Sequence, residues 1–137
     1  MAGFLFYFMK KYATFVLRIG LAAVLFWFAI NQLISPDDWT KLVPEYLSFI
    51  DSTTIIYFNA TFELILGITL LAGLFTRVFA LLFGLHLIPI IISLGYGPSA
   101  VRDVGLMLAA FSLALSGSKN FSIDAILKRK SYKKEKA

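Results

Sequence analysis

Cysteine is absent from this 137-residue sequence, and histidine occurs once, at His86. Without a thiol, the chain cannot form a disulfide, a thiolate metal site or a cysteine-held iron–sulfur cluster. A single imidazole also cannot supply both axial ligands of a haem, and one carboxylate beside it would leave a metal shell largely unfilled. No nucleophile–base pair or phosphate-binding loop stands out either. These absences disfavour self-contained redox chemistry, and we expect no metal site.

Charge is scarce as well, and apolar residues are in excess. Only 15% of the residues are charged and 59% are hydrophobic, whereas soluble domains have about a quarter charged and about half apolar. A small soluble fold leaves too much surface in water to hide this excess, so a very apolar soluble helical protein is the weaker alternative. The composition predicts a protein whose solvent is the lipid bilayer.

Four apolar stretches approach the roughly 20 residues that a helix needs to cross the hydrocarbon core. They cover residues 14–34, 54–74, 78–94 and 103–117, and the last is short enough to need tilt or local thinning of the bilayer. The expected fold is therefore an all-α integral membrane four-helix bundle over residues 14–117. Residues 1–13 would form an interfacial N-terminal segment, and residues 118–137 a basic tail.

The distribution of charge predicts the orientation of the bundle. Lys10, Lys11, Arg77 and the basic tail fall on one side, whereas the 36–53 loop carries four acidic residues against Lys41 alone. By the positive-inside rule, both termini are cytoplasmic in a multi-pass protein of the cell membrane. The tail suits contact with anionic lipid head groups. With no folded soluble module in the pattern, nucleic-acid binding is not expected.

The 36–53 loop is itself amphipathic. Trp39, Leu42, Val43, Tyr46 and Leu47 recur at roughly helical spacing, and Pro44 interrupts them. This pattern predicts a segment that lies at the outer interface or folds over the mouth of the bundle as a lid. An ordinary interfacial connector is the alternative.

Polar residues inside the predicted spans are costly and therefore have partners or a function. At one turn per 3.6 residues, Asn59 and Glu63 share a helix face near mid-membrane, and His86 lies at similar depth on the neighbouring antiparallel span. Arg102 is placed to reach inward toward Glu63. Arg18 lies near the cytoplasmic end, where extension to lipid phosphate and pairing with Glu63 are both open. The candidate site residues are Glu63, His86, Arg102, Asp103, Asn59, Asn31, Gln32 and Arg18.

This polar seam has three interpretations. It can be a structural hydrogen-bond network that holds the helices together. It can line a pocket for a quinone- or lipid-like ligand. It can also conduct a proton or a small solute. The clustering of polar groups toward the outer half favours a pocket over a conducting path.

Short motifs along most of the chain resemble those of one family. They are Leu17-Arg18-Ile19-Gly20, Trp27-Phe28 with Asn31-Gln32-Leu33 and Pro36-Asp37-Asp38-Trp39, Glu63-Leu64-Ile65-Leu66-Gly67, Gly73-Leu74-Phe75-Thr76-Arg77, Arg102-Asp103-Val104-Gly105-Leu106 and Ser122-Ile123-Asp124. In this order and spacing, from about residue 17 to 124, they resemble the DoxX family of small four-span membrane proteins. The chain departs from the pattern at Asn31-Gln32, where a lysine is common, and in having no cysteine.

The resemblance implies a role in membrane redox chemistry. Some relatives are subunits of a thiosulfate:quinone oxidoreductase, and others are linked to membrane-associated redox or stress-defence complexes. The chain is then expected to be a non-catalytic subunit or anchor, with a quinone-like ligand and a soluble oxidoreductase subunit or a second copy as partner. Arg18, Glu63, Arg102 and Asp103 are the motif residues that the resemblance carries over.

Two other functions stay open at this point. One is a small transporter or channel for a proton or solute, although four short helices leave little room for a pore and no inverted repeat is visible. The other is an autonomous membrane oxidoreductase.

Overall fold

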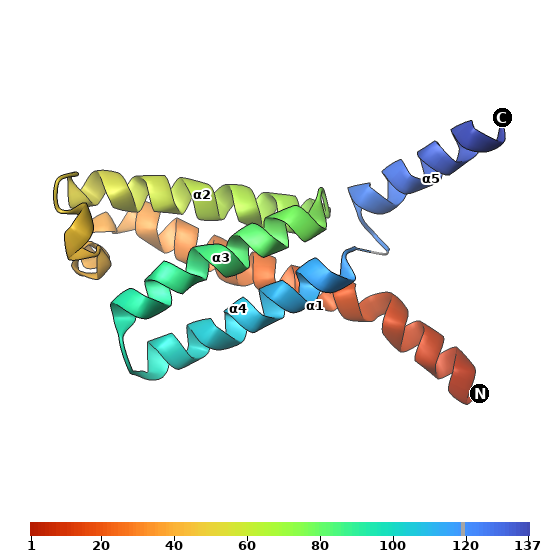
Figure 1. The fold of residues 1–137 in the computed structure, drawn as a ribbon, viewed down its shortest axis with the longest axis horizontal. Helices are drawn as coiled ribbons and strands as arrows, with labels where there is room; N and C mark the ends of the chain where they lie inside the picture. Colours follow the sequence, from red (N-terminus) through yellow and green to blue (C-terminus); the bar gives the residue numbers. More distant parts are fainter. Residues whose placement is uncertain (119) are drawn as a thin grey trace.

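The computed structural model describes residues 1–118 and 120–137, which are helical over most of their length (Figure 1). The helices in chain order are α1 (Ala2–Ile34), α2 (Ser52–Ala72), α3 (Thr76–Leu94), α4 (Pro98–Ser116) and α5 (Ile123–Lys136). Three short 3₁₀ turns, η1 (Pro36–Asp38), η2 (Thr40–Leu42) and η3 (Glu45–Leu47), connect α1 to α2. Helices α1 to α4 are long and apolar enough to cross a membrane, which confirms the predicted all-α membrane bundle.

Local sequence signals mark the helix ends. Asp51 caps α2, because its carboxylate accepts a hydrogen bond from the backbone N–H of Thr54 at 3.0 Å. Gly73 ends α2 in the left-handed conformation, with φ of 70°, which glycine adopts without strain. Pro98 opens α4, where its missing N–H costs nothing. Helix α4 therefore has 19 residues and begins before the predicted span.

The bundle consists of two helix pairs. Helix α1 packs mainly along α2, and α3 mainly along α4. Leu21 and Leu25 of α1, Leu66 and Leu70 of α2, and Leu113 of α4 belong to the core where the pairs meet. Most other large apolar side chains face outward, as expected of helices whose outer surface contacts lipid.

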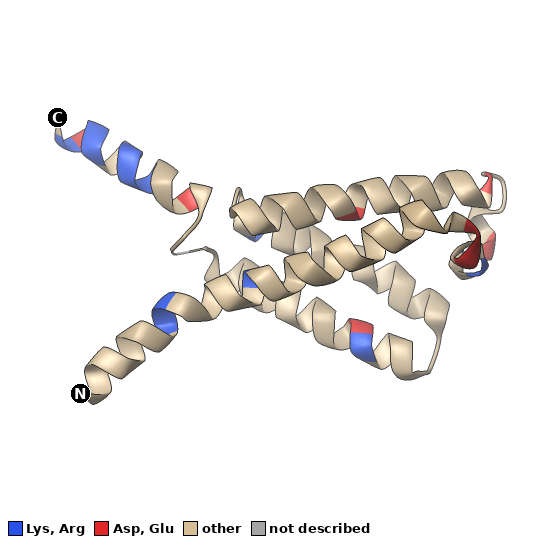
Figure 2. Ribbon diagram, turned by 180° about the vertical axis from the view of Figure 1, so that it is seen from behind, with Lys and Arg blue, Asp and Glu red and all other residues tan. Residues whose placement is uncertain are grey.

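The two ends of the bundle differ in charge. Both chain termini lie at one end, where the start of α1 and the whole of α5 extend beyond the bundle (Figure 1). We call this the terminal end, and the opposite end, which carries the 36–47 segment, the loop end. Lysine and arginine gather on the terminal extensions, whereas acidic residues gather at the loop end (Figure 2). Lys119, one basic residue of the tail, lies outside the described residues.

A polar clasp attaches α5 to the terminal end. The Asp124 carboxylate accepts hydrogen bonds from the backbone N–H groups of Phe75 and Thr76, at 2.7 and 2.9 Å, and from the Ser118 hydroxyl at 3.0 Å. Burial by itself raises the pKa of Asp124, but the hydrogen bonds from Thr76, Phe75 and Ser118 outweigh it, so this pKa lies below its ordinary value. Asp124 thus satisfies the first N–H groups of α3 from 48 residues away.

Arg18 belongs to the same end of the molecule. It is only 1% exposed, and its guanidinium donates to the backbone carbonyls of Phe121 at 2.5 Å and Asn120 at 3.5 Å. Its hydrogen bonds therefore go to the backbone, and neither lipid phosphate nor Glu63, the two partners left open by the sequence, is the partner of this buried guanidinium. Asn120 and Phe121, shortly before α5, supply acceptors that the pattern of α1 alone does not reveal.

Candidate functional site

A partly open cavity of about 450 Å³ lies at the loop end, between the ends of all four long helices. This volume falls within the range of roughly 300–1,000 Å³ that small-molecule sites occupy. Its walls are mainly apolar and include the aromatic rings of Trp27, Phe28 and Trp39. The segment from Trp39 to Leu47 lines the cavity as well, so the amphipathic loop folds over the mouth of the bundle as a roof made of 3₁₀ turns.

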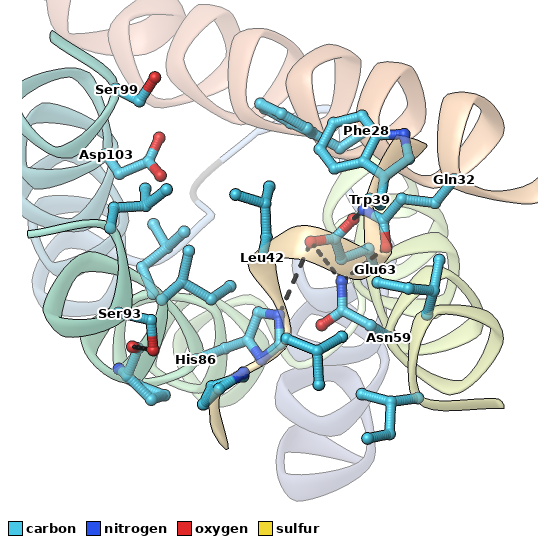
Figure 3. Close-up of a pocket in the computed structure, with 18 of the residues that line it drawn as sticks. Phe28, Gln32, Trp39, Leu42, Asn59, Glu63, His86, Ser93, Ser99 and Asp103 are labelled. Atoms are coloured by element: carbon cyan, nitrogen blue, oxygen red, sulfur yellow. Dashed lines mark hydrogen bonds and ion pairs between the residues drawn. The ribbon is translucent and has the colours of Figure 1, made fainter. Parts of the chain in front are cut away.

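Three polar side chains form a connected network on one wall (Figure 3). Gln32 Nε2 of α1 donates to Glu63 Oε2 of α2 at 2.7 Å. Asn59 Nδ2 donates to Gln32 Oε1 at 2.8 Å and to Glu63 Oε1 at 3.1 Å. The Glu63 carboxylate is thereby held by amide donors from both sides, which fixes its orientation at the cavity wall and offsets the cost of burying it.

His86 of α3 approaches the same carboxylate. Its Nε2 lies 3.7 Å from Glu63 Oε1, which is an ion-pair distance but too long for a hydrogen bond. This nitrogen is buried and has no hydrogen-bond partner among the described residues. The imidazole ring packs edge-on against Phe62 with 4.9 Å between ring centres. His86 is therefore held in place while one of its polar atoms stays unused.

A second charged pair lies on α4. Arg102 Nε donates to Asp103 Oδ1 at 2.8 Å, and the Asp103 side chain is only 5% exposed whereas that of Arg102 is 50% exposed. The Arg102 guanidinium also lies 5.0 Å from the centre of the Phe28 ring, a cation–π contact. These contacts, and none with Glu63, occupy Arg102 within the described part of the chain. The expected inward reach of Arg102 toward Glu63 is not found.

The structure gathers most of the predicted site residues around one cavity. Its lining includes Gln32, Asn59, Glu63, His86, Arg102 and Asp103. Asn31 lies outside it and donates to the carbonyl of Trp27 in its own helix at 2.7 Å, and Arg18 lies at the other end of the molecule. Sequence reasoning did not name Phe28 or Ser99 as site residues, although the cavity includes both. Single aromatic and hydroxyl residues in a membrane helix carry no pattern that would identify them.

The fold and the cavity define a class: a small multi-pass membrane protein with a partly open, polar-edged cavity at one end of a four-helix bundle. Within that class, the family model of DoxX matches residues 13–95, which is more than half of the chain. The chain therefore belongs to the DoxX family, as its motifs predicted. The matched range includes Gln32, Asn59, Glu63 and His86. No curated protein and no solved structure matches the sequence.

Proposed function

We propose that this DoxX-family protein is a membrane subunit that holds a quinone- or lipid-like molecule in the loop-end cavity and does not perform catalysis alone. One observation carries the proposal. Side chains of α1, α2 and α3 converge on a mostly apolar cavity, and the His86 nitrogen beside Glu63 has no partner there. A mostly apolar cavity with a few polar groups in its walls suits a ligand with an apolar body and polar substituents.

The redox role in the proposal comes from the family resemblance. A quinone-binding subunit needs an electron-donating partner, and a soluble oxidoreductase docked at the membrane surface would supply it. Self-contained thiol chemistry has no support, because the chain has no cysteine. The protein then acts as an anchor that presents a membrane-soluble electron acceptor to its partner subunit.

Orientation and localisation form part of the proposal. We place the protein in the plasma membrane. Both termini then lie in the cytoplasm, because the basic residues gather at the terminal end (Figure 2). Residues 1–13 and the tail from residue 118 then lie at the inner face, where the lysines of α5 contact anionic lipid head groups. The cavity consequently opens toward the outer half of the bilayer.

The chain contains its own probe for ligand binding. Its two tryptophans, Trp27 and Trp39, both line the cavity. Addition of a short-chain ubiquinone to the purified protein in lipid nanodiscs should quench tryptophan fluorescence in a saturable manner. A Gln32→Ala variant should weaken this binding at least several-fold, whereas Asn31→Ala should leave it unchanged because Asn31 faces away from the cavity. Linear, non-saturating quenching that is equal in all three proteins would contradict a binding site.

The subunit role is tested separately in native membranes. Quinone reduction driven by a soluble donor substrate should fall when the gene for this chain is deleted, and should return with the full-length chain. Membranes that reduce quinone equally well without the chain would exclude this role, even if the cavity binds quinone.

A further inference from the structure

Two buried carboxylates face the loop-end cavity, and each has a cationic or hydrogen-bond-donating neighbour. The side chains of Glu63 and Asp103 are 8% and 5% exposed, and their neighbours are His86 and Arg102. Figure 3 shows Asp103 and Glu63 on different sides of the cavity. A ligand in this cavity therefore meets an acceptor next to a donor on two walls, rather than donors alone.

The gap between Glu63 and His86 has the size of one shared hydroxyl. The 3.7 Å between Oε1 and Nε2 is too long for a direct hydrogen bond, but an oxygen at about 2.8 Å from each atom closes the triangle. A hydroxyl in that position donates a hydrogen bond to the carboxylate and accepts one from an Nε2–H group of the imidazole. A carbonyl oxygen there can only accept, so it would face the carboxylate with no proton between them.

The Arg102–Asp103 pair on α4 also favours a hydroxyl over a carbonyl oxygen. Arg102 Nε donates to Asp103 Oδ1 at 2.8 Å, and in the described part of the chain no hydrogen bond occupies the other carboxylate oxygen or the outer guanidinium nitrogens of this cavity-lining pair. A second hydroxyl can again donate to the carboxylate and accept from the guanidinium. A benzoquinone ring has its two oxygens at opposite ends, and only its reduced form carries a hydroxyl at both.

We infer that the cavity binds the hydroquinone form of its ligand more tightly than the quinone form, with one hydroxyl at Glu63 and His86 and the other at Asp103 and Arg102. This inference rests on the proposed function, because it assumes a quinone-type ligand. Preferential binding of the reduced form raises the two-electron midpoint potential of the bound pair, by about 30 mV for each tenfold difference in affinity.

The test compares both redox forms of one short-chain ubiquinone on the full-length protein in nanodiscs, without oxygen. Saturable tryptophan quenching by the quinone reports binding. A redox titration followed by quinone absorbance, against empty nanodiscs, reports the preference. We expect at least a tenfold preference for the quinol, seen as an upward shift of about 30 mV or more. Binding with no shift or a downward shift overturns the inference and leaves the proposed function intact. Failure of both forms to bind overturns both.

Two substitutions test whether the carboxylates cause the preference for quinol. Glu63→Gln and Asp103→Asn replace an acceptor by an amide that can also donate to a carbonyl, with little change of shape. Each should reduce the preference for quinol severalfold while quinone binding persists, and Asn31→Ala should leave the preference unchanged. If Glu63→Gln fails to fold because either Gln32 or Asn59 loses its acceptor oxygen, Asp103→Asn still provides the test. Retention of the full preference in a folded Asp103→Asn protein would overturn the assignment of the second hydroxyl.

Discussion

Gln32 and Glu63 join α1 to α2 through a hydrogen bond of 2.7 Å between Gln32 Nε2 and Glu63 Oε2, and both residues are buried. The bond crosses the helix interface close to the cavity, where apolar packing is interrupted. It also orients the carboxylate, because Asn59 donates to its other oxygen. A single interhelical contact thus contributes both to the assembly of the bundle and to the geometry of the site.

Removal of the Gln32 amide should destabilise the bundle. Gln32→Ala leaves the Glu63 carboxylate with fewer donors in a buried position, and interhelical hydrogen bonds in membranes contribute roughly 0.6–2 kcal/mol. We expect a loss of about 1–2 kcal/mol, since the acceptor is a carboxylate. Unfolding of the purified protein in mixed detergent, followed by circular dichroism, measures it. The neighbouring Asn31→Ala change should cost under about 0.5 kcal/mol, and an equal loss in both variants would refute a special role for Gln32.

Because α3 packs closely against α4, we expect that Gly84 cannot be replaced by a larger residue without loss of stability. A Cβ atom there would lie 2.4 Å from Phe111 Cε1, so the ring or the helix must move. Gly84→Ala should destabilise the protein by roughly 1–3 kcal/mol through overpacking. Gly105→Ala is the matched control, because no atom lies within 4 Å of its added Cβ. That control should be neutral or slightly stabilising, since alanine favours helix. A Gly84→Ala protein that unfolds like the control would show that the two helices separate easily.

Hydrophobic runs and residue spacing were sufficient to predict the four membrane helices and the position of Glu63 near His86. Those features depend on single helices and on a short link that makes neighbours antiparallel. The bond from Gln32 depends on the register of α1 against α2, which no periodicity specifies. The partners of Arg18 are even harder to predict from sequence, because its acceptors at Asn120 and Phe121 lie more than 100 residues away.

The roof of the cavity illustrates a different limit. The apolar spacing of residues 39–47 predicted an amphipathic segment, and its apolar residues do line the cavity. Instead of one helix, the segment forms separate 3₁₀ turns, with Val43 and Pro44 in extended conformations between the last two. Proline restricts the residue before it to extended conformations, so the helical spacing could not continue.

Substitution of Gly73 by alanine should disrupt the contact between the α2–α3 turn and the start of α5. An added Cβ would lie 2.3 Å from Ser122 Cβ, at a backbone φ of 70° that disfavours any side chain. A Ser122→Gly background separates the two effects, because it removes the Cβ atom that the new methyl group would meet. We expect Gly73→Ala to cost about 1–2 kcal/mol from backbone strain in either background, and a further loss of about 1–3 kcal/mol from the clash only when Ser122 is present. Equal losses would indicate that Ser122 moves aside freely.

The Asp124 clasp should make stability depend on acid. Because the pKa of Asp124 in the folded protein lies below its ordinary value, the ionised form is favoured by folding. Its contribution is complete above the unfolded pKa of about 3.9 and is lost as the pH falls through the lower, folded value. Titration of Asp124 should therefore not change the thermal midpoint of the protein in detergent between pH 5 and 7. At pH values below about 4, it should lower the midpoint.

Asp124→Asn isolates the clasp from the other carboxylates. At neutral pH it should lose about 1 kcal/mol, the typical size of a helix cap, because the amide accepts fewer of the hydrogen bonds from Phe75, Thr76 and Ser118. Its thermal midpoint should also fall less between pH 5 and pH 3 than that of the unaltered protein. Asp38→Asn, at the exposed loop end, is the matched control and should preserve the full acid response. If both variants retain the same acid-induced fall, Asp124 is not the group that acid titrates in the clasp.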